Sequence, residues 1–159
     1  MQKQSYMDRD YEDEFYLITE DGQIHLKVME VFGFPSETSF LGGYDTRALI
    51  DIQIGSYTAK GAVDISTGQL YMFLQELKSC YQSLQGIASL KNYEGNFDLT
   101  FDFNGLGHVK VSGHFREEMS ARTELRFELD TDQTRIPQVI HGLEDLVSVY
   151  GDEKGVSTR

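Results

Sequence analysis

Hydrophobic and polar residues alternate with a period of two along most of this chain. In its first third the alternation forms four runs, Phe15–Ile18, Ile24–Phe32, Arg47–Ile54 and Tyr57–Ile65. Because successive side chains of a strand point to opposite faces, each run predicts a half-buried β-strand. The dipeptide Asp21-Gly22 separates the first two runs, and Asp-Gly between apolar runs is typical of a hairpin turn.

The period changes after Ile65. Ser66 and Gln69 have the spacing of a capping box at the start of a helix. Apolar residues then recur at helical spacing, at Leu70, Phe73, Leu74, Leu77, Tyr81 and Leu84. This pattern predicts a helix over residues 67–85 with one apolar face, and we expect Gly86 to be its C-terminal cap.

Alternation returns after this helix in four more runs, Ile87–Tyr93, Phe97–Phe103, Gly107–Phe115 and Arg122–Leu129. They predict a meander of antiparallel hairpins. We expect Thr134 to cap a second helix that has Pro137 in its first turn and ends near Tyr150. The order of elements lacks βαβ alternation, so it predicts an α+β fold in which a largely antiparallel sheet packs with about two α-helices.

Composition divides the chain into three parts. We expect residues 1–14 to form an acidic N-terminal arm, residues 15–150 a single α+β domain, and residues 151–159 a flexible C-terminal tail. The length of 159 residues is that of one domain. Its 40% hydrophobic and 12% aromatic residues suffice for a folded core.

The chain is strongly acidic, with 26 Asp and Glu against 14 Lys and Arg and a net charge of −12. This charge disfavours nucleic acid and anionic membranes as partners and favours a basic protein. The first residues lack the apolar run of a signal peptide, and no stretch has the length of a membrane span. We therefore predict a cytoplasmic protein.

Catalytic and metal-binding motifs are not found. The histidines lack the spacing of metal ligands, and they lie at His25, His108, His114 and His141. Cys80 borders the apolar stripe of the first helix, where a buried and unreactive thiol is expected. We expect no catalytic residue, no metal site and no cofactor.

Two groups of acidic residues are candidate sites. The first lies in the arm, where carboxylates and an aromatic ring can dock on a basic partner, and comprises Asp8, Asp10, Tyr11, Glu12, Asp13 and Glu14. The second lies on two predicted strands and can bind a cation or act as acid and base, and comprises Asp98, Asp102, Glu124 and Glu128. A solvated tail and the wet face of an amphipathic sheet are the competing interpretations.

Several stretches resemble the WapI-type bacterial immunity proteins and their uncharacterised relatives. They are Gly61–Ile65, Gln69–Leu77, Glu94–Phe101, Gly107–Val111, Leu125–Asp130 and Asp132–Ile140. The resemblance runs from about Arg47 to Tyr150 and consists of core and turn positions, so it carries over no catalytic residue. It implies a non-enzymatic protein that neutralises a toxin nuclease domain from the same locus by direct binding.

Two other functions stay open at this point. One is a small ligand-binding or cation-binding domain, or an enzyme, that uses the acidic group on the strands. The other is a structural or oligomerising module. The oligomeric state is also open, with a homodimer among the alternatives.

Overall fold

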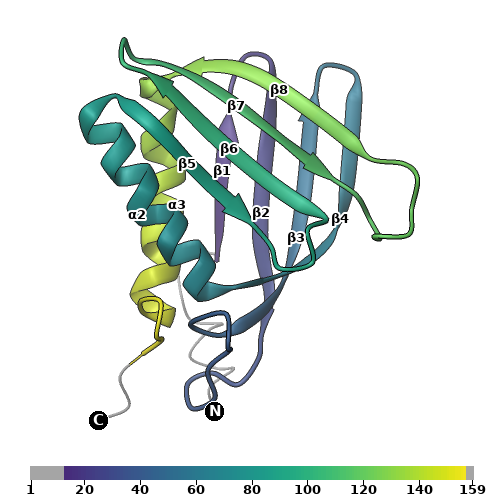
Figure 1. Cartoon of the computed structure of the whole chain (residues 1–159), viewed down its shortest axis with the longest axis vertical. Coiled ribbons are helices and arrows are strands. Elements are labelled where there is room, and N and C mark those ends of the chain that lie inside the picture. Colours follow the sequence, from purple (N-terminus) through teal and green to yellow (C-terminus); the bar gives the residue numbers. More distant parts are fainter. Residues whose placement is uncertain (1–12, 157–159) are drawn as a thin grey trace.

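The computed structural model of this chain describes residues 13–156 (Figure 1). Over this range the protein forms two four-stranded antiparallel sheets and two α-helices. The first sheet has the order β1 (Glu14–Ile18), β2 (Gly22–Val31), β3 (Asp45–Ile54) and β4 (Tyr57–Ser66). The second has the order β5 (Gln85–Lys91), β6 (Phe97–Asn104), β7 (His108–Phe115) and β8 (Leu125–Asp132). The predicted α+β class with antiparallel hairpins is confirmed, and the strands divide into two sheets.

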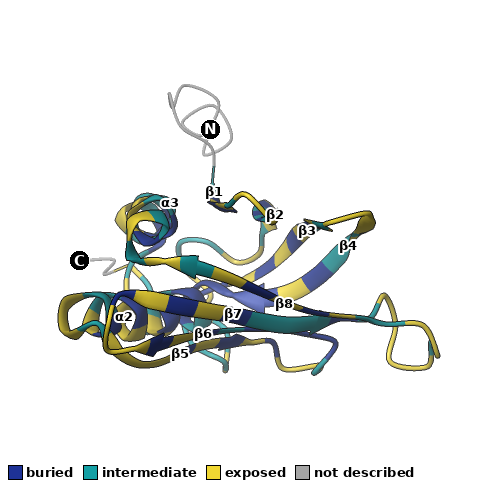
Figure 2. Cartoon of the chain, turned by 90° about the horizontal axis from the view of Figure 1, so that it is seen from above, coloured by how far each residue is buried: buried dark blue, intermediate teal, exposed yellow. Residues whose placement is uncertain are grey.

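The helices lie together on one side of the two sheets (Figures 1 and 2). Helix α2 (Thr67–Ser83) connects the sheets in the chain and contacts β5. Helix α3 (Ile136–Tyr150) follows the short 3-10 helix η1 (Gln133–Arg135) and contacts both α2 and β1. The helix pair therefore covers the side of the core between the edge strands β1 and β5. No helix within residues 13–156 is long and apolar enough to cross a membrane.

One hydrophobic core joins both sheets and both helices. Its largest fully buried side chains include Tyr44, Tyr150, Phe15, Phe73, Phe97 and Phe101. The ring of Phe73 on α2 lies 6.3 Å from that of Phe15 on β1 and 5.7 Å from that of Phe101 on β6. Most apolar residues of the alternating runs thus face a shared interior, as the period of two requires, while Leu49, Tyr57 and Ile87 lie on the exposed surface.

Helix α2 begins as predicted and ends earlier than predicted. The Ser66 Oγ accepts a bond from the Gln69 N–H at 3.1 Å, and the Gln69 Oε1 accepts one from the Ser66 N–H at 2.9 Å. At the other end Leu84 takes the left-handed conformation, with φ of 60°. The predicted cap at Gly86 is wrong, because the chain turns two residues earlier and Gly86 belongs to β5.

The start of the second helix also differs from the prediction at Thr134. The Asp132 carboxylate accepts a bond from the Thr134 N–H at 2.8 Å and so caps η1. The cap position of α3 itself is Arg135, with Pro137 in the first turn as predicted. Bonds from the Thr134 side chain and backbone lower the pKa of Asp132 below its ordinary value.

Residues near both ends of the described range pack on the domain. The Asp13 carbonyl accepts a bond from the Val28 N–H at 2.8 Å, and Glu14 is the first residue of β1. After α3 the backbone N–H of Val156 donates to the Tyr44 hydroxyl at 3.0 Å. Strand β1 thus begins at Glu14, one residue before the predicted start at residue 15. Asp8, Asp10, Tyr11 and Glu12 lie outside the described residues.

Candidate functional site

The four acidic residues predicted on strands lie on or beside the outer face of the second sheet, but they do not converge. Asp98 and Asp102 are on β6, Glu128 is on β8, and Glu124 directly precedes β8. Strand β7 lies between β6 and β8. It places His114 opposite Asp98 and Lys110 opposite Asp102. The two pairs of carboxylates are therefore separated by basic side chains.

Basic groups pair with most of these carboxylates. The His114 Nδ1 lies 2.6 Å from the Asp98 Oδ2, and the Lys110 Nζ lies 3.6 Å from the Glu128 Oε1. Glu124 pairs with both Arg116 and Arg126. The hydrogen bond from Arg116 is the largest cause that lowers the pKa of Glu124, and Arg126 adds to it. This arrangement is typical of a solvated, charge-balanced sheet face.

Metal-binding chemistry finds no support within residues 13–156. No group of three or more His, Cys, Asp or Glu side chains in that range could hold a metal ion. Cys80 is buried, and burial raises the pKa of its thiol, with Glu76 and Asp102 adding to the shift. A neutral buried thiol is a poor nucleophile, which agrees with the unreactive cysteine expected from the sequence.

The two described acids of the predicted arm have partners in the domain. The Asp13 Oδ2 accepts a bond of 2.6 Å from the Tyr150 hydroxyl. The Glu14 Oε2 lies 3.3 Å from the His25 Nε2. The His25 ring in turn stacks on Tyr16, with centroids 4.1 Å apart and planes 2° from parallel. Asp13 and Glu14 thus belong to the folded surface around β1.

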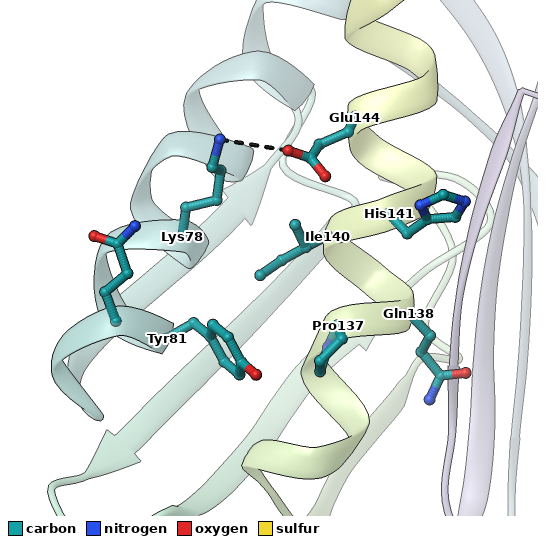
Figure 3. Close-up of a pocket in the computed structure, with 8 residues that line it drawn as sticks. Lys78, Tyr81, Pro137, Gln138, Ile140, His141 and Glu144 are labelled. Atoms are coloured by element: carbon teal, nitrogen blue, oxygen red, sulfur yellow. Dashed lines mark ion pairs between the residues drawn. The ribbon is translucent and has the colours of Figure 1, made fainter.

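A recess of about 640 Å³ lies between the two helices (Figure 3). Tyr81 and Ile140 supply its apolar walls, and the Lys78 Nζ lies 3.4 Å from the Glu144 Oε2 across it. The Gln138 side-chain amide donates to the Ile18 carbonyl at 3.3 Å. Because Lys78, Glu144 and Gln138 each have a partner within the protein, they do not form a convergent catalytic group.

A second recess, of about 520 Å³, has a different lining. Three exposed aromatic residues surround it, Phe32 after β2, Phe40 in the following loop and Tyr93 in the turn between β5 and β6. The carboxylates of Asp45, Asp64 and Glu94 also line it, together with the guanidinium of Arg47. We call this site the aromatic recess. The side chains of Phe40 and Tyr93 are 84% and 67% exposed, and their rings meet edge to face at 5.7 Å.

The loop that carries Phe40 is fixed to the start of α2. The Tyr44 N–H donates to the Thr67 Oγ1 at 2.8 Å, and the Thr67 N–H donates to the Tyr44 carbonyl at 2.8 Å. The Gly68 N–H donates to the Gly42 carbonyl at 3.1 Å. A Cβ at Gly68 would lie 2.4 Å from the Gly42 carbonyl carbon, so the two backbones touch.

The turn that carries Tyr93 is fixed by a pair of buried asparagines. The Asn92 Nδ2 donates to the Asn96 Oδ1 at 2.6 Å, and the Asn96 Nδ2 donates to the Arg116 carbonyl at 2.9 Å. The Gln69 side chain, which also caps α2, donates to the Lys91 carbonyl at 3.2 Å. Phe40 and Tyr93 are therefore held by turns that are ordered before any partner arrives, which lowers the entropic cost of binding.

Sequence reasoning did not single out these aromatic residues. Phe40 lies between predicted strands, beside Gly42-Gly43, where polar turn residues are the rule. The alternation places Tyr93 in the predicted strand Ile87–Tyr93, but β5 ends at Lys91 and leaves Tyr93 in the turn. A large aromatic side chain beside turn glycines is the signal that could have found both. Their proximity could not be read from the chain, because it depends on how the loops pack against α2.

An exposed aromatic recess carried on fixed turns is typical of a protein that binds another macromolecule. Residues 16–151 match the model of the immunity protein WapI-like family, and the chain belongs to that family. This confirms the resemblance seen in the sequence and extends it from Arg47 toward the N-terminus. No curated protein matches the chain.

Two solved structures show weaker likeness. A chain of the CdiA-CT/CdiI toxin and immunity complex from Enterobacter cloacae is 16% identical, with 76% of this chain and 97% of that chain aligned and a TM-score of 0.43. WHY1 from Arabidopsis thaliana is 7% identical, with 87% and 90% aligned and a TM-score of 0.48. At these scores neither likeness bears on function.

Proposed function

We propose that this protein is an immunity protein that neutralises a cognate toxin by direct, non-catalytic contact. Membership of the WapI-like immunity family over residues 16–151 is the observation that carries this proposal. The charge-balanced outer face of β6, β7 and β8 fits a binding protein better than an enzyme that uses the acids there.

We further propose that the toxin is a basic nuclease domain encoded at the same locus. The net charge of −12 suits a partner whose surface is built to hold nucleic acid. Opposite charge speeds the encounter of two proteins, and speed matters for an inhibitor that must reach a toxin before it cuts. The encounter would take place in the cytoplasm, where nucleic acid is the target.

The arm remains part of this proposal as a steering element. Asp8, Asp10, Tyr11 and Glu12 precede β1, and Asp13 and Glu14 continue the acidic segment into the domain. Deletion of residues 1–12 should slow association with the toxin and leave dissociation almost unchanged, because steering charges act mainly on the encounter rate. An equal change in both rates would contradict the steering role.

The direct test uses the toxin domain encoded beside this gene. We expect the two purified proteins to form a stable complex that abolishes nuclease activity. The association rate should fall steeply between low salt and 0.5 M NaCl, because the Debye length is only about 10 Å at 0.1 M and shrinks further with added salt. Full nuclease activity in the presence of excess protein would refute the proposed function.

A further inference from the structure

We propose that the aromatic recess binds a lysine or arginine side chain presented by an exposed segment of the toxin. This inference rests on the proposed function, since it names the surface that contacts the same partner. It concerns Phe32, Phe40 and Tyr93 together with Asp45 and Glu94.

The aromatic rings offer the first contact for a cation. Phe40 and Tyr93 meet edge to face, with planes 84° apart, so the two rings present faces in different directions. A cationic side chain is attracted to a ring face within about 6 Å of its centroid. Exposed aromatic residues that stay rigid on binding are also the commonest anchors of protein interfaces.

The carboxylates of the recess offer the second contact. Asp64 already pairs with Arg47, at 3.3 Å. Asp45 and Glu94 are exposed, and neither forms an ion pair with another residue in the described range. Arg47, the one base in the lining, is taken up by Asp64, so a partner cation that reaches the rings meets two carboxylates outside any ion pair in the described range, and a charge-assisted hydrogen bond can form.

The size and framework of the recess agree with such an occupant. Its volume of about 520 Å³ lies within the roughly 300–1,000 Å³ common among binding sites, and it can admit a long side chain. The recess between α2 and α3 offers less to a cation, because Tyr81 is its one Phe or Tyr ring and its Glu144 already pairs with Lys78. Charge and aromatic character together select the recess at Phe40.

Two truncations test the aromatic contacts, each with a control of matched exposure. Phe40→Ala and Tyr93→Ala remove the rings from the recess. Leu106→Ala and Tyr57→Ala remove side chains that are 88% and 69% exposed elsewhere. Both control residues lie away from the recess. Tyr57 is the first residue of β4, whereas Asp64 of the recess lies near the other end of that strand. Leu106 lies in the turn after β6, whereas Tyr93 of the recess lies in the turn before β6. Thermal unfolding checks that all four variants remain folded.

We expect Phe40→Ala and Tyr93→Ala each to weaken binding of the toxin domain by about 10- to 100-fold, the range of interface anchors. Leu106→Ala and Tyr57→Ala should change the dissociation constant by less than about threefold. If the wild-type protein binds and inhibits the toxin while all four variants bind equally well, the inference is overturned and the proposed function stands.

Charge variants test the cationic nature of the occupant. Asp45→Asn and Glu94→Gln keep the shape of the recess and remove its free carboxylates. We expect each to weaken toxin binding by about 10- to 100-fold, as for hydrogen bonds to charged groups. Glu20→Gln, in the exposed turn between β1 and β2, is the matched control and should have little effect. Equal effects of all three changes would show diffuse attraction and overturn the specific contact.

A tetra-arginine peptide tests the recess without the toxin. In NMR titration it should shift the ring resonances of Phe40 and Tyr93 in the wild-type protein, and Asp45→Asn should reduce those shifts. Tetraglycine is the control peptide. Peptide binding at the recess without any binding of the toxin domain would refute the proposed function and keep the recess as a cation site. Resonance shifts confined to residues of β8 would show that the peptide binds elsewhere and would overturn the proposed binding at the recess.

Discussion

The hydroxyl of Tyr150 donates a hydrogen bond of 2.6 Å to the carboxylate of Asp13, 137 positions earlier in the chain. This bond joins the end of α3 to the start of β1. The Phe34 ring packs edge to face against both Tyr150 and Tyr44, with each pair of centroids 5.1 Å apart. The loop that carries Phe40 therefore rests on the same aromatic cluster that holds the two ends of the domain together.

Loss of the Tyr150 hydroxyl should destabilise the domain. In Tyr150→Phe the half-buried Asp13 carboxylate loses a donor, and we expect the free energy of unfolding in urea to fall by about 1–3 kcal/mol. Tyr81→Phe is the matched control, because Tyr81 lies at the rim of the helix recess and should change stability by less than about 0.5 kcal/mol. Equal stability of the two variants would contradict the structural role of the bond.

Gly43 should be far less replaceable than Gly55. Both have a left-handed backbone, with φ of 64° and 59°, so alanine costs roughly 1–2 kcal/mol at either site. A Cβ at Gly43 would also lie 2.2 Å from the Thr67 Oγ1, whereas one at Gly55 meets nothing within 4 Å. We expect Gly43→Ala to lose about 1–3 kcal/mol more than Gly55→Ala, measured by chemical denaturation.

Acid should remove the contribution that the Glu124 carboxylate makes to the stability of the folded protein. Its pKa lies below the ordinary 4.5 in the folded protein because Arg116 and then Arg126 stabilise the carboxylate. The resulting stability is present above pH 4.5 and is lost as the pH falls through the folded value. Glu124→Gln should therefore be less stable than the wild type at pH 7, and the difference should close in acid. A stability difference of the same size at pH 7 and in acid would contradict this role of Glu124.

The Cys80 thiol should react slowly in the native protein. It is buried, and desolvation raises its pKa, so the thiolate that attacks disulfide reagents is scarce at pH 7. We expect labelling by an aromatic disulfide to accelerate by at least about tenfold in 6 M urea, as unfolding returns the thiol to its ordinary pKa and exposes it. Rapid native labelling at the rate of a free thiol would contradict this picture.

Much of the fold could be predicted because it depends on local periodicity. The alternation around Ile24 and Phe101 and the helical stripe through Phe73 place each element and its inward face. The division into two sheets could not be predicted in this way, since it depends on which strands pair across α2. The cap at Leu84 was missed because a non-glycine residue takes the left-handed conformation there.

The candidate sites could be predicted even less well, because they depend on contacts between elements that are distant in the sequence. The period of two correctly places Asp98 and Asp102 on one face of β6. It does not reveal that β7 brings His114 and Lys110 between them and the acids of β8. The aromatic recess joins Phe40 and Tyr93 through packing against α2, and no spacing rule along the chain encodes that contact.

The contact between Gly42 and Gly68 makes these two positions intolerant of substitution, in contrast to the exposed position 40 nearby. A Cβ at Gly68 would collide with the Gly42 backbone, and a Cβ at Gly42 would lie 2.6 Å from the Glu153 carbonyl oxygen, so the base of the loop is closed to substitution. Phe40, two residues before Gly42, projects into solvent and is not subject to that steric constraint. The side chain at position 40 can therefore change during evolution while the same framework continues to fold.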